Sequence, residues 1–401
     1  MTRLRPQRAL TENSIIRTRT QPVSCTSRAI RPWRNLSVNG KFLSGYLTGV
    51  HRVGLELSRE LGERAEEIAE IVGGGPLFRT PGRDHPAWIN SSIPTSGMSA
   101  RGVSGQVWEQ VTLLRQSRTD LLLNLCNLGP ALHPAMITMI HDAQTFITPE
   151  SYTTGFGRFY RALLPALGRR SLRVLTVSDF SAQELARWDV APTERIRVIP
   201  NGVDHVLRVR PDRNVLRRIG ARPFVLALAS AQRHKRIGTL IRAFSDPRLA
   251  HLDLILFGPA SPTDFARSGH PLPPNARCLS FVSDEEVRAL MEAALCFALP
   301  STTEGFGLPP LEAMLIGCPA IVSRAGALPG LCGEDVLYAS PDDPGEWVEA
   351  IRRLADDPEM RRHRAAVGRR RAARYTWRHA GDALMAVLRE VSDERRSATT
   401  P

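Results

Sequence analysis

The chain lacks any long apolar run. Among its 401 residues there is no stretch of about 18 or more consecutive apolar residues, although a helix needs about 20 to cross a bilayer. The first 34 residues carry eight arginines, a single acid and no apolar stretch of the kind found in secretory signals. We therefore expect no transmembrane helix and no signal peptide, and we expect residues 1–34 to form a disordered basic arm.

Cysteine is scarce, and its spacing excludes the usual zinc and redox motifs. The six cysteines, at positions 25, 126, 278, 296, 318 and 332, form no CxxC pair and no Cys/His ligand spacing. Cys296 and Cys318 lie in or beside apolar runs, which predicts buried thiols. The pattern fits a reducing cytoplasm and argues against a structural zinc ion.

Lysine is nearly absent, since it occurs only at positions 41 and 235 and leaves 51 of the 53 basic residues as arginine. A net charge of +13 invites a nucleic-acid hypothesis. The arginines are scattered, however, and form no basic stripe interleaved with aromatic residues. We therefore expect no nucleic-acid partner and attribute the arginine bias to a GC-rich genome. The excess positive charge favours peripheral contact with an anionic membrane surface.

Short apolar runs alternate with amphipathic or capped segments, which is typical of α/β layers with a largely parallel sheet. In the first half we expect strands at 36–43 (an edge strand), 120–125, 135–140, 174–177 and 196–199, with helices at 50–61, at 156–172 and from 181. In the second half we expect strands at 224–229, 252–257, 295–299 and 320–323, with helices at 237–244, 283–294, 311–316, 347–354, 361–374 and 378–391. Residues 73–100 are predicted to be loop, and turn residues near 201–210 mark a junction between two Rossmann-like halves.

Residues 304–312 read Glu-Gly-Phe-Gly-Leu-Pro-Pro-Leu-Glu and are the most informative segment. They connect a predicted buried strand to a short helix, and their two glycines let the backbone approach a ligand closely. Free N–H groups at such a helix start bind anions, and open α/β sheets bind ligands in this crevice. One carboxylate before the turn and one within the helix could hold hydroxyl groups on either side of a diphosphate, as in a nucleotide sugar. An ordinary strand–loop–helix joint with solvated glutamates is the alternative.

The wider segment 299–314 resembles the donor-site motif of GT-B retaining glycosyltransferases of the family 4 group. The segments Thr48-Gly-Val-His-Arg52, Ile140-His-Asp142, Thr176-Val-Ser-Asp-Phe-Ser181 and Val198-Ile-Pro-Asn-Gly-Val-Asp204 resemble other motifs of that family. The resemblance covers roughly residues 35–392. It implies an α/β GT-B fold, with two Rossmann-like domains facing each other across a cleft. We expect an acceptor domain over 35–203, a nucleotide-sugar donor domain over 204–377, and a helix over 378–392 that crosses back to the first domain.

The resemblance also implies roles for the residues of the donor-site motif. Glu304 would lie beside the donor sugar, and Glu312 would bind the ribose of the nucleotide. The backbone amides around Phe306, Gly307 and Leu308 would face the diphosphate and the sugar.

A cation is expected to neutralise the diphosphate as it leaves. Lys235 matches the family lysine with this role, and its identity as one of only two lysines supports a need for a compact ammonium group. The family arginine that precedes this lysine is replaced by His234, so we assign the second cation to Arg233. Gly330 stands where the family commonly has a glutamate, and we assign no role to that turn.

The predicted acceptor domain contributes two further candidates. His141 follows a buried strand and matches a family histidine that reaches the donor sugar. Gly49 opens the first helix and is expected to approach the diphosphate or the acceptor, although a plain helix entry is the alternative.

The resemblance implies a cytoplasmic glycosyltransferase that works at the inner face of the membrane. It would move a sugar, such as mannose from GDP-mannose, to a lipid-linked saccharide or another polysaccharide precursor. No protein nucleophile is expected, because in such enzymes the donor phosphate oxygen is thought to accept the acceptor's proton. No metal ion is expected, because no acidic pair is spaced to hold one, and no other cofactor is expected. Two alternatives stay open: transfer to a soluble acceptor, and a catalytically weak scaffold that only binds sugar nucleotides or partners. The changes at 233–235 and at 330 keep the second of these open.

The helix predicted at 156–172 has two interpretations. Its aromatic and leucine positions (156, 159, 160, 163, 164 and 167) follow near-helical spacing beside arginines at 158, 161, 169 and 170. A core-facing stripe with solvated arginines is one interpretation. A basic amphipathic helix that rests on an anionic membrane is the other.

Overall fold

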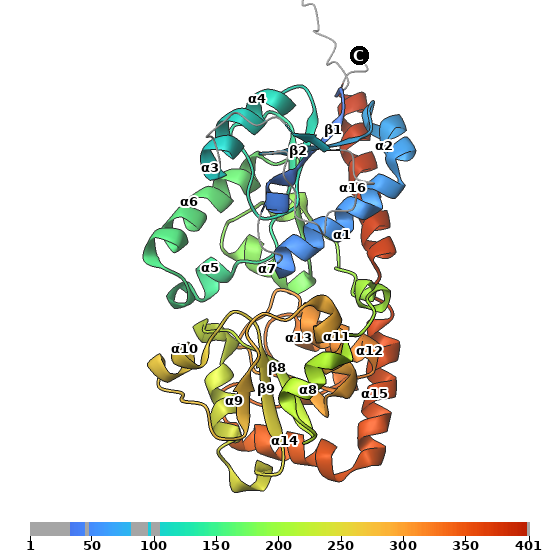
Figure 1. Ribbon diagram of the computed structural model, residues 1–401. Coiled ribbons are helices and arrows are strands. Elements are labelled where there is room, and N and C mark those ends of the chain that lie inside the picture. Colours follow the sequence, from blue (N-terminus) through green and yellow to red (C-terminus); the bar gives the residue numbers. More distant parts are fainter. Residues whose placement is uncertain (1–32, 45–47, 82–94, 98–104, 399–401) are drawn as a thin grey trace, which may run out of the picture.

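The computed structural model describes residues 33–44, 48–81, 95–97 and 105–398, which form two parallel β-sheets flanked by helices (Figure 1). The predicted basic arm lies outside the described residues except for its last two. Of these, Trp33 is already buried and Arg34 donates its backbone N–H to Thr119, so packed structure begins two residues before the predicted boundary. None of the helices in the described ranges is both long and apolar enough to span a bilayer.

The N-terminal sheet has the strand order β3-β2-β1-β4-β5-β6-β7, with every neighbouring pair parallel. Its strands are β1 (Leu36–Asn39), β2 (Pro76–Thr80), β3 (Thr95–Gly97), β4 (Leu121–Asn124), β5 (Met136–Met139), β6 (Arg173–Thr176) and β7 (Ile196–Val198). The helices connecting them are α1 (Gly49–Glu63), α2 (Ala65–Val72), α3 (Gly105–Val107), a π-helical segment (Trp108–Leu113), α4 (Leu114–Ser117), α5 (Gln144–Ile147), α6 (Thr154–Arg170) and α7 (Asp179–Arg187).

The C-terminal sheet has the order β10-β9-β8-β11-β12-β13 and is also parallel throughout. Its strands are β8 (Phe224–Leu228), β9 (Asp253–Phe257), β10 (Ala276–Cys278), β11 (Cys296–Leu299), β12 (Ala320–Val322) and β13 (Leu337–Tyr338). Its helices are α8 (Leu216–Ile219), α9 (Ile237–Ala243), α10 (Pro262–Arg267), α11 (Asp284–Ala293), α12 (Leu308–Ile316), α13 (Leu328–Cys332), α14 (Pro344–Asp356) and α15 (Pro358–Ala372). The predicted α/β class with two Rossmann-like sheets is confirmed.

Side chains of the C-terminal strands alternate between two layers of core. Along β8, Val225 and Ala227 pack with α9 and α14, whereas Phe224 and Leu226 face the opposite cluster with α11 and α12. A strand that is buried on both faces is expected to be continuously apolar, as β8 is. Cys296 and Cys318 are buried free thiols, as predicted, and the described cysteines 126, 278 and 332 are also free.

The sequence interpretation was wrong about one edge of the N-terminal sheet. β1 is not an edge strand, because β2 pairs with it on one side and β4 on the other. β2 lies in the segment predicted to be loop. It has only a short alternating pattern (burial of Pro76, Phe78 and Thr80) and Pro76 stands at its first position, where a missing N–H is tolerated.

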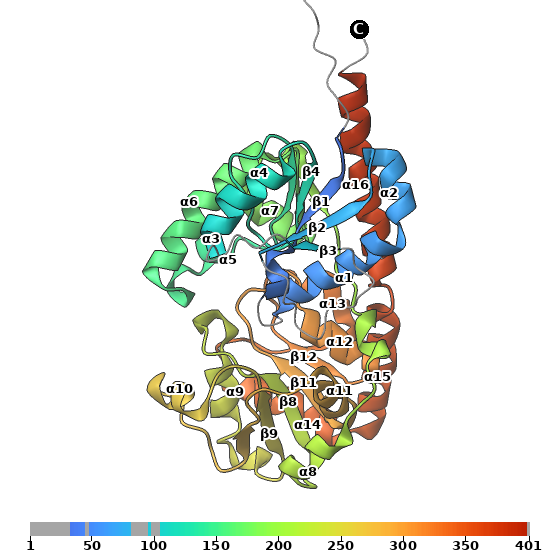
Figure 2. The ribbon, with the colours of Figure 1, turned by 45° about the horizontal axis from the view of Figure 1, so that its top comes forward.

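The last helix, α16 (Trp377–Ser397), continues from the side of α15 and runs along the N-terminal domain (Figures 1 and 2). It packs against α1 and α2, with Leu384, Leu388 and Val391 buried in the same core cluster as residues of those helices. Arg173 of β6 pairs with Glu390 at 2.9 Å and also with Glu394. The chain therefore passes between the two domains twice, once at 199–209 and once at 375–377.

Candidate functional site

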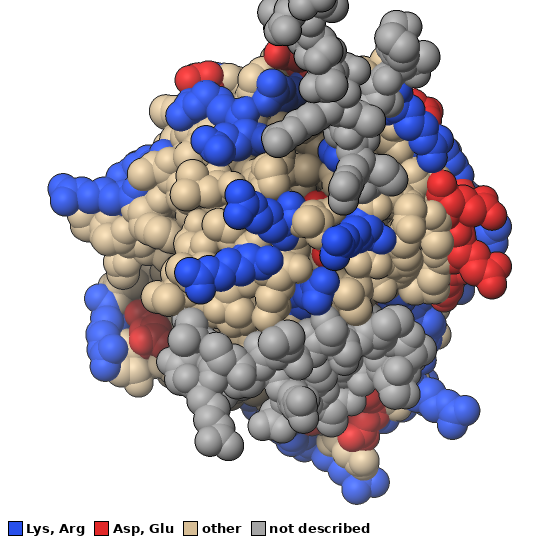
Figure 3. Space-filling model, turned by 90° about the horizontal axis from the view of Figure 1, so that it is seen from above, with Lys and Arg blue, Asp and Glu red and all other residues tan. Residues whose placement is uncertain are grey.

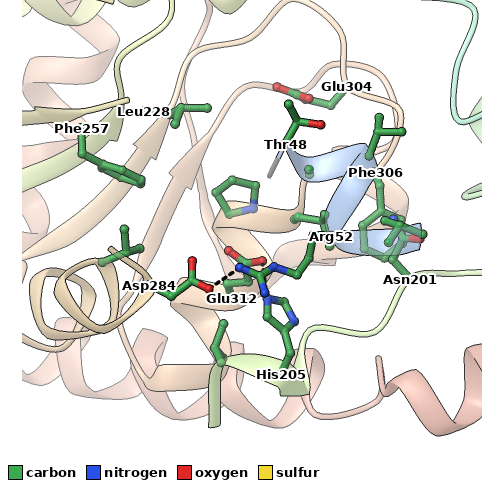
Figure 4. A pocket seen from close by; sticks show the side chains of 18 of the residues that line it. Thr48, Arg52, Asn201, His205, Leu228, Phe257, Asp284, Glu304, Phe306 and Glu312 are labelled. Atoms are coloured by element: carbon green, nitrogen blue, oxygen red, sulfur yellow. Dashed lines mark hydrogen bonds and ion pairs between the residues drawn. The ribbon is translucent and has the colours of Figure 1, made fainter. Parts of the chain in front are cut away.

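A cavity of about 720 Å³ lies between the two domains, at the carboxyl ends of strands from both sheets (Figure 4). Eight of the nine residues that the sequence predicted for the site line it, namely Gly49, His141, Lys235, Glu304, Phe306, Gly307, Leu308 and Glu312. The ninth, Arg233, does not. The topology thus gathers residues that are far apart in the sequence, because parallel strands place their carboxyl ends at the same edge.

Glu304 is held by a short polar network. The Lys235 ammonium donates to both of its oxygens, at 2.8 Å to Oε1 and 3.0 Å to Oε2, and the Ser301 hydroxyl donates to Oε1 at 2.6 Å. Glu304 is 8% exposed. A buried carboxylate needs such partners, since an unpaired charge removed from water is costly. The predicted cation and the predicted sugar-side carboxylate are therefore direct neighbours.

The loop that follows Glu304 is fixed by the N-terminal domain. Gly305 accepts hydrogen bonds from the hydroxyls of Ser178, at 2.6 Å, and Ser181, at 3.2 Å. A Cβ at Gly305 would lie 3.0 Å from the Cβ of Asp142 across the domain boundary, so any larger residue would require Asp142 or the loop to shift by a few tenths of an ångström. The loop at 304–307 and the N-terminal domain consequently meet at the cavity.

The start of α12 presents backbone donors in an unusual arrangement. Gly307 caps the helix with φ +93°, a left-handed conformation that favours glycine, and Pro309 follows at the first turn. Pro309 and Pro310 have no N–H, so the donors available near an anion are the amides of Phe306, Gly307 and Leu308. The Phe306 ring is buried edge-on against Tyr375 at 5.8 Å, which leaves its backbone rather than its ring to serve a ligand.

Glu312 lies one helical turn further along α12 and contacts a histidine that the sequence interpretation missed. His205 Nε2 is 3.2 Å from Glu312 Oε1, and His205 Nδ1 accepts the indole N–H of Trp377 at 3.1 Å. His205 follows the Asn-Gly-Val-Asp turn at the domain junction. A histidine at a junction beside a ligand crevice was the only signal in the sequence that could have indicated it.

His141 is buried at the cavity wall, and its burial lowers the pKa to about 4. Its Nε2 lies 2.8 Å from the carbonyl of Leu125, which can only accept, so this nitrogen carries the proton. Nδ1 is then an acceptor. At neutral pH the ring is uncharged and suited to accept a hydrogen bond from a hydroxyl group. Burial also raises the pKa of the neighbouring Asp142 carboxyl.

The turn at 233–235 sends three consecutive side chains in different directions. Lys235 points into the cavity, whereas His234 is buried against Tyr152 of the N-terminal domain, with ring centroids 6.4 Å apart. Burial lowers the pKa of His234 to about 4. Arg233 is exposed and outside the cavity lining. The histidine that replaces the expected arginine therefore fills a contact between the domains.

A second missed feature is an ion pair across the mouth of the cavity. Arg52 of α1 pairs with Asp284 at the start of α11, and both line the cavity (Figure 4). Leu228, Phe257 and Met291 of the C-terminal domain form an apolar part of the lining. Within the described residues, no group of three or more His, Cys, Asp or Glu side chains is placed to hold a metal ion.

Two family models match the two halves of the chain. Residues 47–207 match the model for glycosyltransferase family 4, and residues 209–371 match the model for glycosyl transferases group 1. The matched regions meet where the chain first passes from one sheet to the other.

Curated relatives align over part of the chain. An MMP alpha-(1->4)-mannosyltransferase of Mycolicibacterium hassiacum is 33% identical over 55% of this chain and 54% of its own length. The O-antigen chain mannosyltransferase RfbU of Salmonella typhimurium is 29% identical over 57% of this chain and 63% of its own length. A D-inositol 3-phosphate glycosyltransferase of Saccharomonospora viridis is 29% identical over 63% of this chain and 65% of its own length. The chain thus spans between about half and two thirds of these relatives.

Solved structures share the arrangement of both domains. Sucrose-phosphate synthase from Thermosynechococcus elongatus superposes with a TM-score of 0.70 and 17% identity, over 90% of this chain and 100% of that one. WaaG, a glycosyltransferase involved in lipopolysaccharide biosynthesis, superposes with a TM-score of 0.67 and 15% identity, over 88% of this chain and 99% of that one. Anabaena Alr3699/HepE in complex with UDP and glucose superposes with a TM-score of 0.66 and 18% identity, over 91% of this chain and 100% of that one. These likenesses establish the two-domain GT-B fold.

Proposed function

Because this chain belongs to the glycosyltransferases of group 1 and family 4, we propose that it transfers a sugar from a nucleoside-diphosphate sugar to a saccharide acceptor, with retention at the anomeric carbon. The observation that carries the proposal is the joined Lys235–Glu304 pair beside the free amides of α12, with Glu312 further along the same helix. We favour mannose from GDP-mannose as the donor, because two of the relatives described above are named as mannosyltransferases.

The donor would lie along α12. Its ribose would contact Glu312, its diphosphate the amides of Phe306–Leu308 together with Lys235, and its sugar Glu304. The apolar wall near Phe257 and Met291 suits the base. A neutral His141 would accept a hydrogen bond from a sugar hydroxyl group at Nδ1.

In the transfer step, the acceptor hydroxyl oxygen bonds to the anomeric carbon as the bond from that carbon to the diphosphate oxygen breaks. The acceptor's proton passes to the departing phosphate oxygen, so that no covalent intermediate on the protein is called for. Lys235 and the helix amides would stabilise the negative charge that grows on the diphosphate, a placement of fixed donors that is usually the largest single contribution to such catalysis. In this proposal the positive charge comes from these groups rather than from a metal ion. Arg233 is too exposed to share the role without movement.

Donor binding tests the proposal directly. Thermal-shift measurements with UDP-, GDP- and dTDP-sugars are expected to show stabilisation by one of them, because a ligand at about 100 times its Kd adds about 2.7 kcal/mol to the folded state. Glu312→Ala should lose most of this shift, whereas Glu349→Ala, an exposed position on α14, should keep it. The absence of any shift in the wild-type protein would contradict a nucleotide-sugar function. A shift without transfer to any lipid-linked or soluble saccharide would favour a binding scaffold.

We also propose that the acceptor is lipid-linked and that the N-terminal domain rests on an anionic membrane surface. Helix α6 has features that bear on both interpretations. Leu164 and Leu167 are buried, whereas Phe156 and Phe159 are each 42% exposed beside the exposed Arg158, and Arg170 is exposed at the C-terminal end of the helix. Seen from above, Lys and Arg side chains are spread over the visible face, whereas acids lie around its rim, with the largest group at the right (Figure 3). Exposed rings beside basic residues are typical of contact with a membrane interface.

Sedimentation with vesicles checks this placement. The full chain is expected to pellet with vesicles rich in anionic phospholipid, less so at high salt, and little with neutral vesicles, since each basic residue near such a surface contributes about 1 kcal/mol. A variant with Phe156→Ser, Phe159→Ser, Arg158→Gln and Arg170→Gln should pellet several-fold less. Arg369→Gln with Arg370→Gln removes the same charge from α15 and should pellet as wild type does. If the α6 variant also pellets as wild type, this helix does not face the membrane.

A further inference from the structure

The two chain crossings between the domains are bonded to each other. The backbone N–H of Val203 donates to the carbonyl of Tyr375 at 3.0 Å, and the backbone N–H of Trp377 donates to the Asp204 carboxylate at 2.8 Å. A Cβ at Gly202 would lie 2.2 Å from the backbone nitrogen of Trp377, so the two crossing segments approach each other at a distance that only glycine allows. The junction is a packed unit rather than a loose linker.

His205 connects this junction to the cavity. It lies in the short 3-10 turn Asp204–Arg208 and is 5% exposed. Its ring packs against the Trp377 ring in a tilted orientation, with ring centroids 5.9 Å apart. On its other side it reaches Glu312 of α12, which lines the cavity. A single buried side chain thus touches both the junction and the carboxylate proposed to bind ribose.

The hydrogen bonds fix which nitrogen of His205 carries the proton. An indole N–H can only donate, so Nδ1, which lies 3.1 Å from the Trp377 Nε1, must be the acceptor. The neutral ring then has its proton on Nε2, which faces Glu312 Oε1 at 3.2 Å and donates to it. Trp377 therefore favours the tautomer with the proton on Nε2. In that tautomer, His205 donates a hydrogen bond to the Glu312 carboxylate.

We propose that His205 is a positioning residue for nucleotide binding: it fixes one oxygen of Glu312 so that the carboxylate meets the hydroxyl groups of the ribose. The proposal rests on the proposed function and assigns a role to a residue of the junction. A flexible glutamate must lose side-chain freedom when it binds a ligand, and a partner that holds it beforehand removes that cost. The effect should concern only ligands with ribose hydroxyls.

The experiment compares a nucleoside diphosphate with its 2′,3′-dideoxy form. Dissociation constants are measured by calorimetry for GDP and UDP, and the one that the wild-type protein binds is paired with its dideoxy analogue. We expect His205→Phe to weaken binding of the ribonucleotide about tenfold, the effect of one hydrogen bond to a charged group, and to leave the dideoxy form unchanged. His205→Gln places an amide oxygen and N–H in the same relation as Nδ1 and Nε2, and it should restore the preference for ribose.

Two further variants separate positioning from folding. In the Glu312→Ala background, His205→Phe should cause no additional loss, because the carboxylate it positions is gone. Trp377→Phe removes the donor that sets the tautomer, and it should reduce the preference for ribose even if His205→Phe does not fold. Equal weakening of both nucleotides in these variants would overturn the positioning role, since a purely structural contact would not distinguish them. If the wild-type protein binds none of GDP, UDP and dTDP, the proposed function fails and the inference fails with it. Binding of dTDP alone, whose sugar lacks the 2′-hydroxyl, would overturn only the inference.

Discussion

Replacement of Lys235 by alanine is expected to lower kcat by about 10²–10³-fold, the usual effect of removing one fixed donor from a developing negative charge. The expectation rests on where the ammonium lies. It bridges both oxygens of Glu304 and lines the cavity beside the amides that would face the diphosphate. Because the charge grows as the bond to the sugar breaks, the loss should appear more in kcat than in the Kd of the donor.

The chain offers a matched control in its only other lysine. Lys41 pairs with the buried Glu109 at 2.9 Å and lies outside the cavity lining. Lys41→Ala also leaves a buried glutamate without its ammonium, so it should cost stability but not catalysis. Steady-state kinetics and thermal melts of both variants separate the two effects. Full activity in the Lys235→Ala variant would show that another cation holds the diphosphate.

Replacement of Gly326 by alanine is expected to disturb the site through the backbone. Gly326 has φ +58°, and a Cβ there would lie 2.4 Å from both the nitrogen and the oxygen of Glu304. The left-handed conformation alone costs a residue with a side chain about 1–2 kcal/mol, and the clash can be relieved only if the Glu304 backbone moves. A shift of about 1 Å at a reacting centre can cost about 10²-fold. We expect kcat/KM to fall by that order and Tm to fall by several degrees.

The control for this prediction is Gly330→Ala, on the adjoining helix α13. Nothing lies within 4 Å of a Cβ at Gly330, and alanine in a helix is favoured over glycine by about 0.5–1 kcal/mol. This variant should keep wild-type kinetics with an equal or higher Tm. If Gly326→Ala behaves in the same way, the backbone at Glu304 is more adaptable than the close contact implies.

The sequence was most informative where the site is built from one continuous segment. Glu304, the glycine turn and Glu312 follow one another through a strand, a loop and a helix, so their order along the chain already predicts their order in space. His205 and Arg52 were missed because their partners, Glu312 and Asp284, lie far away in the sequence. Arg52 and Asp284 are 232 positions apart, and no local pattern records that two distant helices end at the same cavity.

Arg233 illustrates a different limit. Matching a sequence to a family motif assigns residues by their position along the chain. In a 3-10 turn, which has about three residues per rotation, the side chains of consecutive residues point to different sides. The turn Arg233–Lys235 brings Lys235 into the cavity and buries His234, which leaves Arg233 in solvent. β2 was missed for a related reason, since its short pattern gains its stability from pairing with β1 rather than from its own residues.

The position of α16 reverses the usual relation between synthesis and folding. Domains generally fold in the order in which the ribosome delivers them, beginning with the N-terminal one. Here the N-terminal domain needs Leu384, Leu388 and Val391 to cover α1 and α2, and these residues are synthesised only after the whole C-terminal domain. The C-terminal domain has its own layers complete once α15 has appeared. The domain that is translated first is therefore the one that must wait, with an uncovered apolar face, until α16 has been synthesised.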